Sequence, residues 1–196
     1  MTKNSLKKAL ICMKIKIIDN LKNKKLISPH YNFVFDKKTG FFARWGKTLD
    51  DNPEFGLPEI ADIEVTTICH GAKGKLCQFC YKGNTSHGKN MPLETFKRLF
   101  EKLPKSVTQI AFGADANGTS NPDLLPMMQF CRAQGVIPNI TVADITEETA
   151  KQLAEVCGAV SVSRYDKDAC YNSVASLTHF GLQQCNIHCM LSEETY

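Results

Sequence analysis

Strand-like and helix-like segments alternate along this chain from residue 61 onward, and this alternation limits the possible folds more than any other feature. Amphipathic helical segments begin near Pro92, Asn121, Thr146 and Asp168, where a proline or a capping side chain stands at the helix start. Strands are predicted between them at 62–66, 107–112, 136–142, 159–163 and 184–191. Strands joined by single helices predict an α/β domain with a parallel sheet and right-handed crossovers.

Residues 1–60 do not follow this alternation. The segments 31–35 and 41–45 are rich in aromatic residues, and Gly40 stands in the turn between them, where a residue at positive φ is suitable. The segment 50–58 contains two prolines and a glycine, which is typical of a connecting loop. We therefore expect an N-terminal segment over 1–60 that contains a β-hairpin, followed by the α/β domain over 61–196.

The composition is that of an ordinary soluble globular protein, with 43% hydrophobic and 22% charged residues. A net charge of +4 is too small to indicate a nucleic-acid partner. No apolar run approaches about 18 residues, so no membrane span or membrane partner is predicted, and the basic N-terminus lacks the long apolar core of a secretory signal. A solvated surface is predicted for the N-terminal lysines, which are Lys3, Lys7, Lys8, Lys14, Lys16, Lys22, Lys24 and Lys25.

Nine cysteines is a high and odd number for a chain without a secretory signal, which disfavours a disulfide framework. A reducing compartment such as the cytoplasm leaves core packing and metal binding as explanations. Cys131 and Cys157 fall on the apolar stripes of helices and are expected to pack as small hydrophobes. Cys185 and Cys189 share a strand face, and both thiols could point into a barrel interior. A second cluster or a radical relay is one interpretation, and core packing is the favoured one.

The strongest chemical signal is Cys69-x7-Cys77-x2-Cys80, which directly follows the first strand of the α/β domain. Ligands bind at this end of parallel strands. Three thiolates on one loop can hold three corners of a [4Fe–4S] cluster and leave the fourth iron open. A structural zinc site needs a fourth ligand, which His70 or His87 could supply. Core packing of the three cysteines is the third alternative, although the segment is rich in glycine and lysine, unlike a core.

This segment resembles the signature of the radical S-adenosylmethionine (radical SAM) superfamily, which has the form C-x3-C-x2-C with an aromatic residue before the third cysteine. Phe79 and the final C-x2-C match, whereas the first gap here contains seven residues instead of three. The similarity extends more loosely over 61–196. This region resembles the first five units of the family's partial (β/α)6 TIM-like barrel, so we expect the chain to be a C-terminally shortened form with an exposed, self-associating last strand.

The resemblance implies a cytoplasmic enzyme with two cofactors, a [4Fe–4S] cluster held by the three cysteines and S-adenosylmethionine on its fourth iron. One electron, from a donor such as flavodoxin or ferredoxin, would cleave the sulfonium to a 5′-deoxyadenosyl radical. That radical would abstract hydrogen from a substrate that the sequence does not identify. Two other functions stay open: a zinc-stabilised binding module, and a catalytically inactive shortened partner of a longer enzyme.

The resemblance also assigns residues to the S-adenosylmethionine pocket. Gly113 matches the glycine-rich motif after the second strand, and Asp115 would accept from the methionine ammonium or, alternatively, cap a helix. Ser163 would lie at the ribose. Arg164 would pair with the methionine carboxylate or form a surface salt bridge, and Ile187 would pack on the adenine or be an ordinary core residue.

Overall fold

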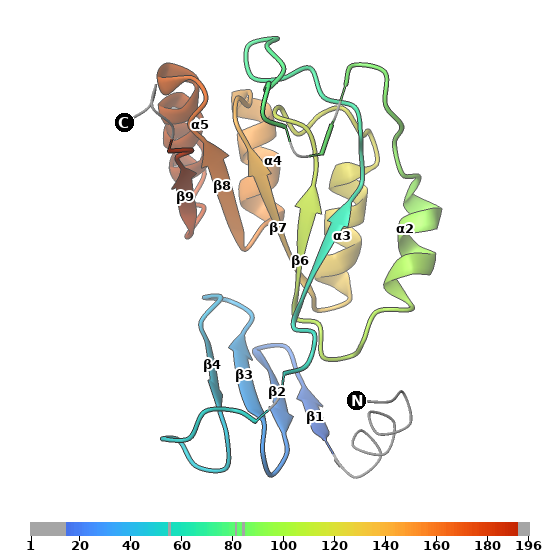
Figure 1. The fold of residues 1–196 in the computed structure, drawn as a ribbon, viewed down its shortest axis with the longest axis vertical. Helices are drawn as coiled ribbons and strands as arrows, with labels where there is room; N and C mark the ends of the chain where they lie inside the picture. The colour runs from blue at the N-terminus through green and yellow to red at the C-terminus, as the bar shows by residue number, and fades with distance from the viewer. Residues whose placement is uncertain (1–14, 55, 81, 84, 192–196) are drawn as a thin grey trace. The chain divides into compact units, whose positions relative to one another are not determined.

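The computed structural model describes residues 15–54, 56–80, 82–83 and 85–191, and these residues form two compact units (Figure 1). The smaller unit contains the described residues up to Glu59 together with the segment Pro104–Thr108. The larger unit contains Ile60–Leu103 and the described residues from Gln109 onward. Cys12, Tyr81 and four of the N-terminal lysines, Lys3, Lys7, Lys8 and Lys14, lie outside the described residues.

The smaller unit is a four-stranded antiparallel sheet in the order β1-β2-β3-β4. Its strands are β1 (Lys16–Asp19), β2 (Asn23–Ile27), β3 (Asn32–Asp36) and β4 (Phe42–Trp45). The predicted hairpin is confirmed: β3 and β4 pair in a register that sets Asn32 opposite Trp45 and Phe35 opposite Phe42, and Gly40 in the turn has φ 73°. The two lysine-rich strands that precede the hairpin were not expected from the sequence.

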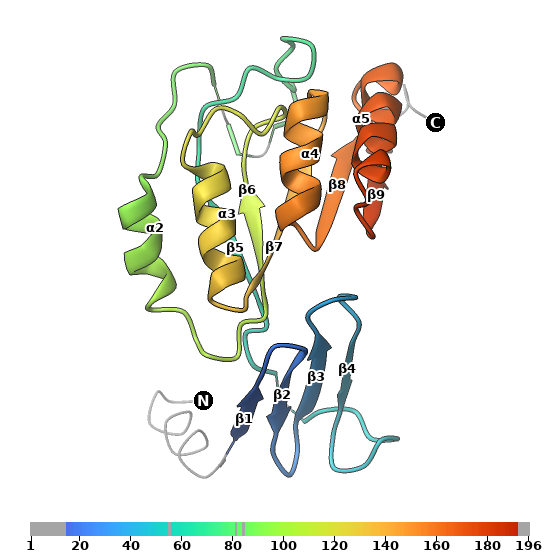
Figure 2. The ribbon, with the colours of Figure 1, turned by 180° about the vertical axis from the view of Figure 1, so that it is seen from behind.

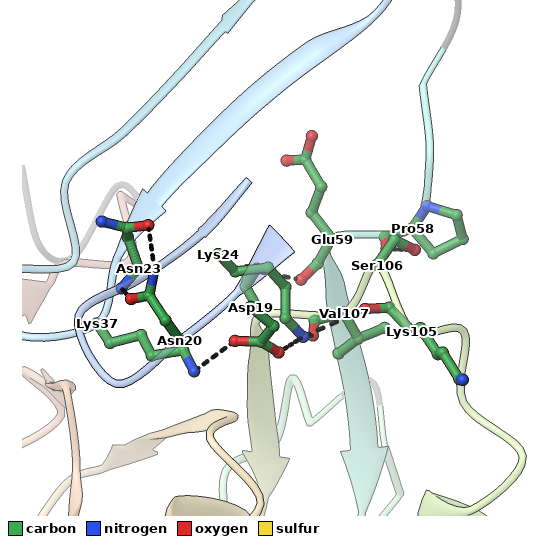
Figure 3. Close-up of polar contacts among 11 residues, drawn as sticks. Asp19, Asn20, Asn23, Lys24, Lys37, Pro58, Glu59, Lys105, Ser106 and Val107 are labelled. Atoms are coloured by element: carbon green, nitrogen blue, oxygen red, sulfur yellow. Dashed lines mark hydrogen bonds and ion pairs between the residues drawn. The ribbon is translucent and has the colours of Figure 1, made fainter. Parts of the chain in front are cut away.

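Lys24 corrects the prediction that the N-terminal lysines form a solvated surface. The residue is only 5% exposed, because the alternation of β2 turns it to the same buried side as Leu26. Figure 3 shows its ammonium group donating hydrogen bonds to the carbonyl oxygens of Lys105, at 3.2 Å, and Val107, at 2.9 Å. It also forms an ion pair with Asp19 at 3.1 Å. Lys24 therefore attaches the segment Pro104–Thr108 to the small sheet.

The larger unit is a mixed α/β structure, as predicted, with a five-stranded sheet in the order β5-β6-β7-β8-β9 in which every neighbouring pair is parallel. The strands are β5 (Ile60–Glu64), β6 (Gln109–Gly113), β7 (Ile137–Val142), β8 (Ala159–Ser163) and β9 (Cys185–His188). The helices that connect successive strands are α2 (Leu93–Phe100), α3 (Leu124–Ala133), α4 (Glu147–Val156) and α5 (Lys167–His179). Successive strands thus lie side by side, each joined to the next by one crossover.

All four helices cover the same face of the parallel sheet, as the two opposite views in Figures 1 and 2 show. The strands turn apolar side chains toward them, and Ile110, Val160 and Val162 are completely buried. An aromatic group continues this core, with the rings of Phe96 and Phe112 at 5.3 Å between centroids. This face therefore supplies most of the apolar burial that stabilises the unit.

The opposite face of the sheet is largely polar. Residues paired in register share a face, and residues next to each other along a strand point to opposite faces. The polar set opposite the helices is Asp62, Glu64, Gln109, Asn139, Thr141, Ser161, Ser163, Asn186 and His188. Parallel sheets are usually apolar on both faces, and this sheet departs from that pattern on the face opposite the helices.

The helices that the structure describes contain 8 to 13 residues. None of them combines the length and the apolar character needed to cross a lipid bilayer.

Candidate metal centre

The cysteines lie on a long loop that leaves the sheet at the end of β5 and returns to form α2. Its two limbs are joined by backbone hydrogen bonds, from Thr67 to the carbonyl of Lys89 at 2.9 Å and from Cys69 to the carbonyl of Thr85 at 2.8 Å. Below them, Met91 donates to the carbonyl of Val65 at 2.9 Å. These bonds hold the two limbs together at the base of the loop. The segment that carries Cys69, Cys77 and Cys80 therefore extends from a fixed base.

The tip of the loop is a tight turn that depends on glycine. Gly71 has φ 75°, Lys73 φ 48° and Gly74 φ 73°, and Ala72 forms a β-bridge with Lys75. A Cβ atom on Gly71 would lie 1.8 Å from the carbonyl oxygen of Lys75, so no other residue fits there without a change in the backbone. The Gly71 N–H points to the sulfur of Cys69 at 3.3 Å.

The loop is fastened to the ends of four strands. Lys82 forms an ion pair with Glu64 on β5 at 2.8 Å and donates to the carbonyl of Ala114, directly after β6, at 3.4 Å. The Lys73 N–H donates to the carboxylate of Asp144, after β7, at 3.2 Å, and the Lys73 ammonium pairs with Asp166, after β8, at 2.7 Å. The cysteine loop therefore lies over the carboxyl edge of the sheet, where parallel-sheet proteins bind ligands.

The thiols of Cys69, Cys77 and Cys80 are half-buried and close enough to influence one another. Burial raises the pKa of the Cys77 thiol, and electrostatic interaction with Cys69 and Cys80 raises it further. Among the described residues, however, no three Cys, His, Asp or Glu side chains converge on a point where they could hold a single metal ion. The three cysteines thus form a loose group rather than a preformed single-ion site.

Tyr165 belongs to this group, although the sequence did not suggest it. Its ring lies 5.6 Å from that of Phe79, measured between centroids, with an angle of 59° between the ring planes. Its hydroxyl lies near the side chains of Cys77 and Ser163, and burial raises the pKa of the phenol. Tyr165 therefore links the C-x2-C half of the loop to the end of β8.

Two of the residues assigned to the S-adenosylmethionine pocket have structural explanations here. Gly113 lies so near β5 that a Cβ atom on it would be 2.9 Å from the Cα atom of Glu64. Asp115 is 2% exposed, and its carboxylate accepts hydrogen bonds from the backbone N–H groups of Asn117, at 3.2 Å, and Ser120, at 3.1 Å. Of the two roles left open for Asp115, these contacts support that of holding the loop before α3.

The structure separates Ser163 from Ile187. Ser163 is on the polar face beside His188, whereas Ile187 pairs with Val162 and is on the helix-covered face. Cys185 shares that face, because it pairs with Val160. Of the two interpretations left open for this cysteine, the position agrees with the favoured one, core packing. The periodicity of the strand correctly grouped 185 and 187, and the register with β8 shows which face of the sheet they occupy.

Arg164 is half-buried. Its backbone N–H donates to the carbonyl of His188 at 2.8 Å. Its side chain makes no ion pair within the part of the chain that the structure describes.

The expected packing of Cys131 and Cys157 is confirmed. Cys131 is completely buried and Cys157 is 5% exposed. Burial raises the pKa of each thiol to about 12, so both stay protonated at neutral pH and act as small apolar side chains. They are suitable controls for the three loop cysteines.

Replacement of Gly71 by alanine is expected to reduce metal retention by the cysteine loop. The left-handed backbone alone costs a residue with a Cβ atom about 1–2 kcal/mol, and the overlap with Lys75 forces the turn to open. Gly74→Ala is the matched control, because Gly74 has the same backbone conformation but no atom within 4 Å of the position that a Cβ atom would take. Iron bound per chain after anaerobic reconstitution is the measurement, and equal values for the two variants would contradict the role given to Gly71.

Comparison of the chain with known protein families gave no match, and comparison with curated proteins gave none either.

Proposed function

We propose that this chain is a radical SAM enzyme in which Cys69, Cys77 and Cys80 hold a [4Fe–4S] cluster. The observation that carries the proposal is the position of the cysteine loop, which is tied by Lys73 and Lys82 to the ends of β5, β6, β7 and β8. When bound, the cluster and S-adenosylmethionine would supply a 5′-deoxyadenosyl radical that abstracts hydrogen from a substrate. The described residues supply the ligands, the binding surface and the shielding from water.

The donor set fits a cluster better than a zinc ion. A tetrahedral zinc ion draws all its sulfur ligands to about 2.3 Å from one point, whereas each cysteine of a [4Fe–4S] cluster binds a different iron and can stand farther from the others. The three thiols are close enough for their charges to act on one another, and in a cluster each would bind its own iron. The Gly71 N–H directed at the Cys69 sulfur is a further match, because hydrogen bonds to sulfur tune such clusters.

The sheet is consistent with a partial (β/α)6 TIM-like barrel. Sequential strand order with all helices on one face is the arrangement of βα units around a barrel axis. We propose that the five units here curve around the polar face, so that Asn139, Ser161 and Ser163 face the bound cofactor and substrate. A largely polar lining of this kind provides hydrogen bonds for a hydrophilic ligand. A barrel whose interior is filled by packed side chains would instead be lined with apolar residues.

Reconstitution with iron and sulfide under anaerobic conditions tests the proposal. We expect a brown protein with about four iron and four sulfide per chain, which forms 5′-deoxyadenosine from S-adenosylmethionine when given a strong reductant. Flavodoxin or ferredoxin is the proposed physiological donor, and the cytoplasm the proposed compartment. A colourless, zinc-containing protein would instead indicate a binding module, and a cluster without cleavage would indicate an inactive relative.

Ser163→Ala should weaken S-adenosylmethionine binding while iron content is unchanged. Ser163 is a buried polar side chain on the polar face, being 7% exposed and close to the Tyr165 hydroxyl beside the metal centre. Loss of one hydrogen bond to a polar or charged ligand group corresponds to about 1–3 kcal/mol. Calorimetry on the reconstituted protein measures the affinity. Thr178→Ala, an exposed change on α5, is the control, and equal affinities would place the cofactor elsewhere.

A further inference from the structure

We infer that Tyr165 is a positioning residue for the metal centre, which holds the C-x2-C half of the cysteine loop against the end of β8. This inference rests on the proposed function. It assigns to a residue outside the cysteine motif the task of fixing Cys77, the middle of the three ligands. Aromatic, polar and backbone contacts together carry it.

The first contact is aromatic. Phe79 and Tyr165 are 55% and 46% exposed, so neither is held by a surrounding core. Their rings nevertheless meet at 5.6 Å in a tilted arrangement, which is a favourable geometry for an aromatic pair. Since Phe79 lies between Cys77 and Cys80, restraint of its ring also restrains both ligands.

The second contact is the proximity of three polar side chains. Ser163 interacts with the Tyr165 hydroxyl, and that hydroxyl interacts with the Cys77 sulfur. Ser163 is buried at the end of β8, so its hydroxyl has a fixed position next to Tyr165. A phenol that accepts from Ser163 has its own O–H free to donate to Cys77.

The backbone around Tyr165 is itself fixed. The Arg164 N–H donates to the carbonyl of His188 on β9 at 2.8 Å, and the Tyr165 N–H to the carbonyl of Ser163 at 3.0 Å. The next residue, Asp166, caps α5 by accepting from the Ala169 N–H at 2.9 Å. Because Asp166 also pairs with Lys73, the segment 163–166 contacts the cysteine loop both at its turn and at its C-x2-C half.

A metal site with three protein ligands depends on neighbouring residues such as Tyr165 more than a site with four protein ligands does. A site with three protein ligands has no fourth ligand that helps to fix the loop. The distances between the three thiols therefore depend on the contacts of the loop with the rest of the protein. Partners that orient metal ligands commonly change affinity or activity by about 10–100-fold when removed. Hydrogen bonds to a ligand sulfur also shift the reduction potential of an iron–sulfur cluster.

Three variants separate these effects. Tyr165→Phe retains the ring contact and removes the hydroxyl, and Tyr165→Ala removes both. Tyr171→Ala is the matched control, because Tyr171 is also a tyrosine with 46% exposure, on α5.

The first measurement uses the metal-free full chain and hydrogen exchange at the amides of Cys80 and Gly83. These amides donate to the carbonyls of Cys77 and Cys80 at 3.2 and 3.1 Å and report the order of the loop. We expect Tyr165→Ala to accelerate their exchange by about tenfold, from loss of an aromatic pair and a hydrogen bond. Exchange no faster than in Tyr171→Ala would overturn the inference, whether or not the chain binds a cluster.

The second measurement uses the reconstituted protein. Tyr165→Phe is expected to keep the wild-type iron content and to shift the midpoint potential of the cluster to a more negative value, because a donor to the Cys77 sulfur stabilises the reduced, more negative cluster. An unchanged potential together with unchanged loop exchange in Tyr165→Ala would refute the positioning role. Failure of the wild-type chain to form any cluster would refute the proposed function alone and leave the exchange result to decide the role of Tyr165.

Discussion

Replacement of any one of Cys69, Cys77 and Cys80 by alanine is expected to abolish the [4Fe–4S] cluster. Two thiolates do not hold a four-iron cluster stably. Iron and sulfide analysis after anaerobic reconstitution, with the visible absorbance of the cluster, measures the loss. The three variants should be indistinguishable from one another, because each removes one of three equivalent corners.

Cys131→Ala and Cys157→Ala are the controls for this result. Both remove a thiol that is buried in the helix-covered core and protonated at neutral pH. Each variant should lose a little stability, about 1 kcal/mol for a small cavity, and retain its full iron content. Wild-type iron content in Cys77→Ala, or loss of iron in Cys131→Ala, would show that the cluster is not held by the loop.

The sequence predicted the parallel sheet well because its signals are local. Caps, apolar stripes and the periodicity of strands depend on neighbours a few residues away. Thr146, for example, was predicted to cap a helix, and its side chain accepts from the Thr149 N–H at 3.2 Å. The polar face was also visible in principle, since Ser161 and Ser163 alternate with Val160 and Val162. The alternation within a strand does not show which of the two faces the helices cover.

The candidate site depends more strongly on contacts between residues far apart in the sequence. The sequence alone therefore predicted the position of its residues less well than it predicted the strands and helices. Periodicity shows that residues 185 and 187 share a face, but only the register with β8 decides which face. Tyr165 stands two residues beyond a strand, in a segment whose direction no local rule fixes. Its contact with Phe79 spans 86 positions in the sequence and arises only once the loop lies over the sheet edge.

The small sheet illustrates the same limit. β2 has the sequence Asn-Lys-Lys-Leu-Ile, and a run of lysines usually indicates exposed surface. The residue Lys24 is buried because carbonyl oxygens from the segment Pro104–Thr108 are there to receive its ammonium group. Those acceptors lie about 80 residues away along the chain, so the composition of β2 alone could not reveal them.

Lys24→Met is expected to lower the free energy of unfolding of the smaller unit by about 2–4 kcal/mol. The methionine side chain keeps most of the volume of lysine but leaves the carbonyl oxygens of Lys105 and Val107 without their donor, and each buried unsatisfied acceptor costs about 1–3 kcal/mol. Asp19 contributes little to the loss, because Lys37 still pairs with it at 2.6 Å. The same segment is held by a second contact, from the Ser106 hydroxyl to the carbonyl of Pro58 at 2.6 Å, which limits the damage (Figure 3).

Lys25→Met gives the matched comparison, since it makes the same chemical change at the next position of β2, where the side chain is exposed. Its effect should stay within about 0.5 kcal/mol, as for most surface changes. Urea unfolding followed by the fluorescence of Trp45 isolates the smaller unit, because Trp45 lies in β4 and is the one tryptophan of the sequence. Equal urea midpoints for the two variants would mean that the buried ammonium group of Lys24 contributes no net stability. A lower midpoint in Lys24→Met alone would establish this ammonium group as the one that attaches residues 104–108 to the sheet.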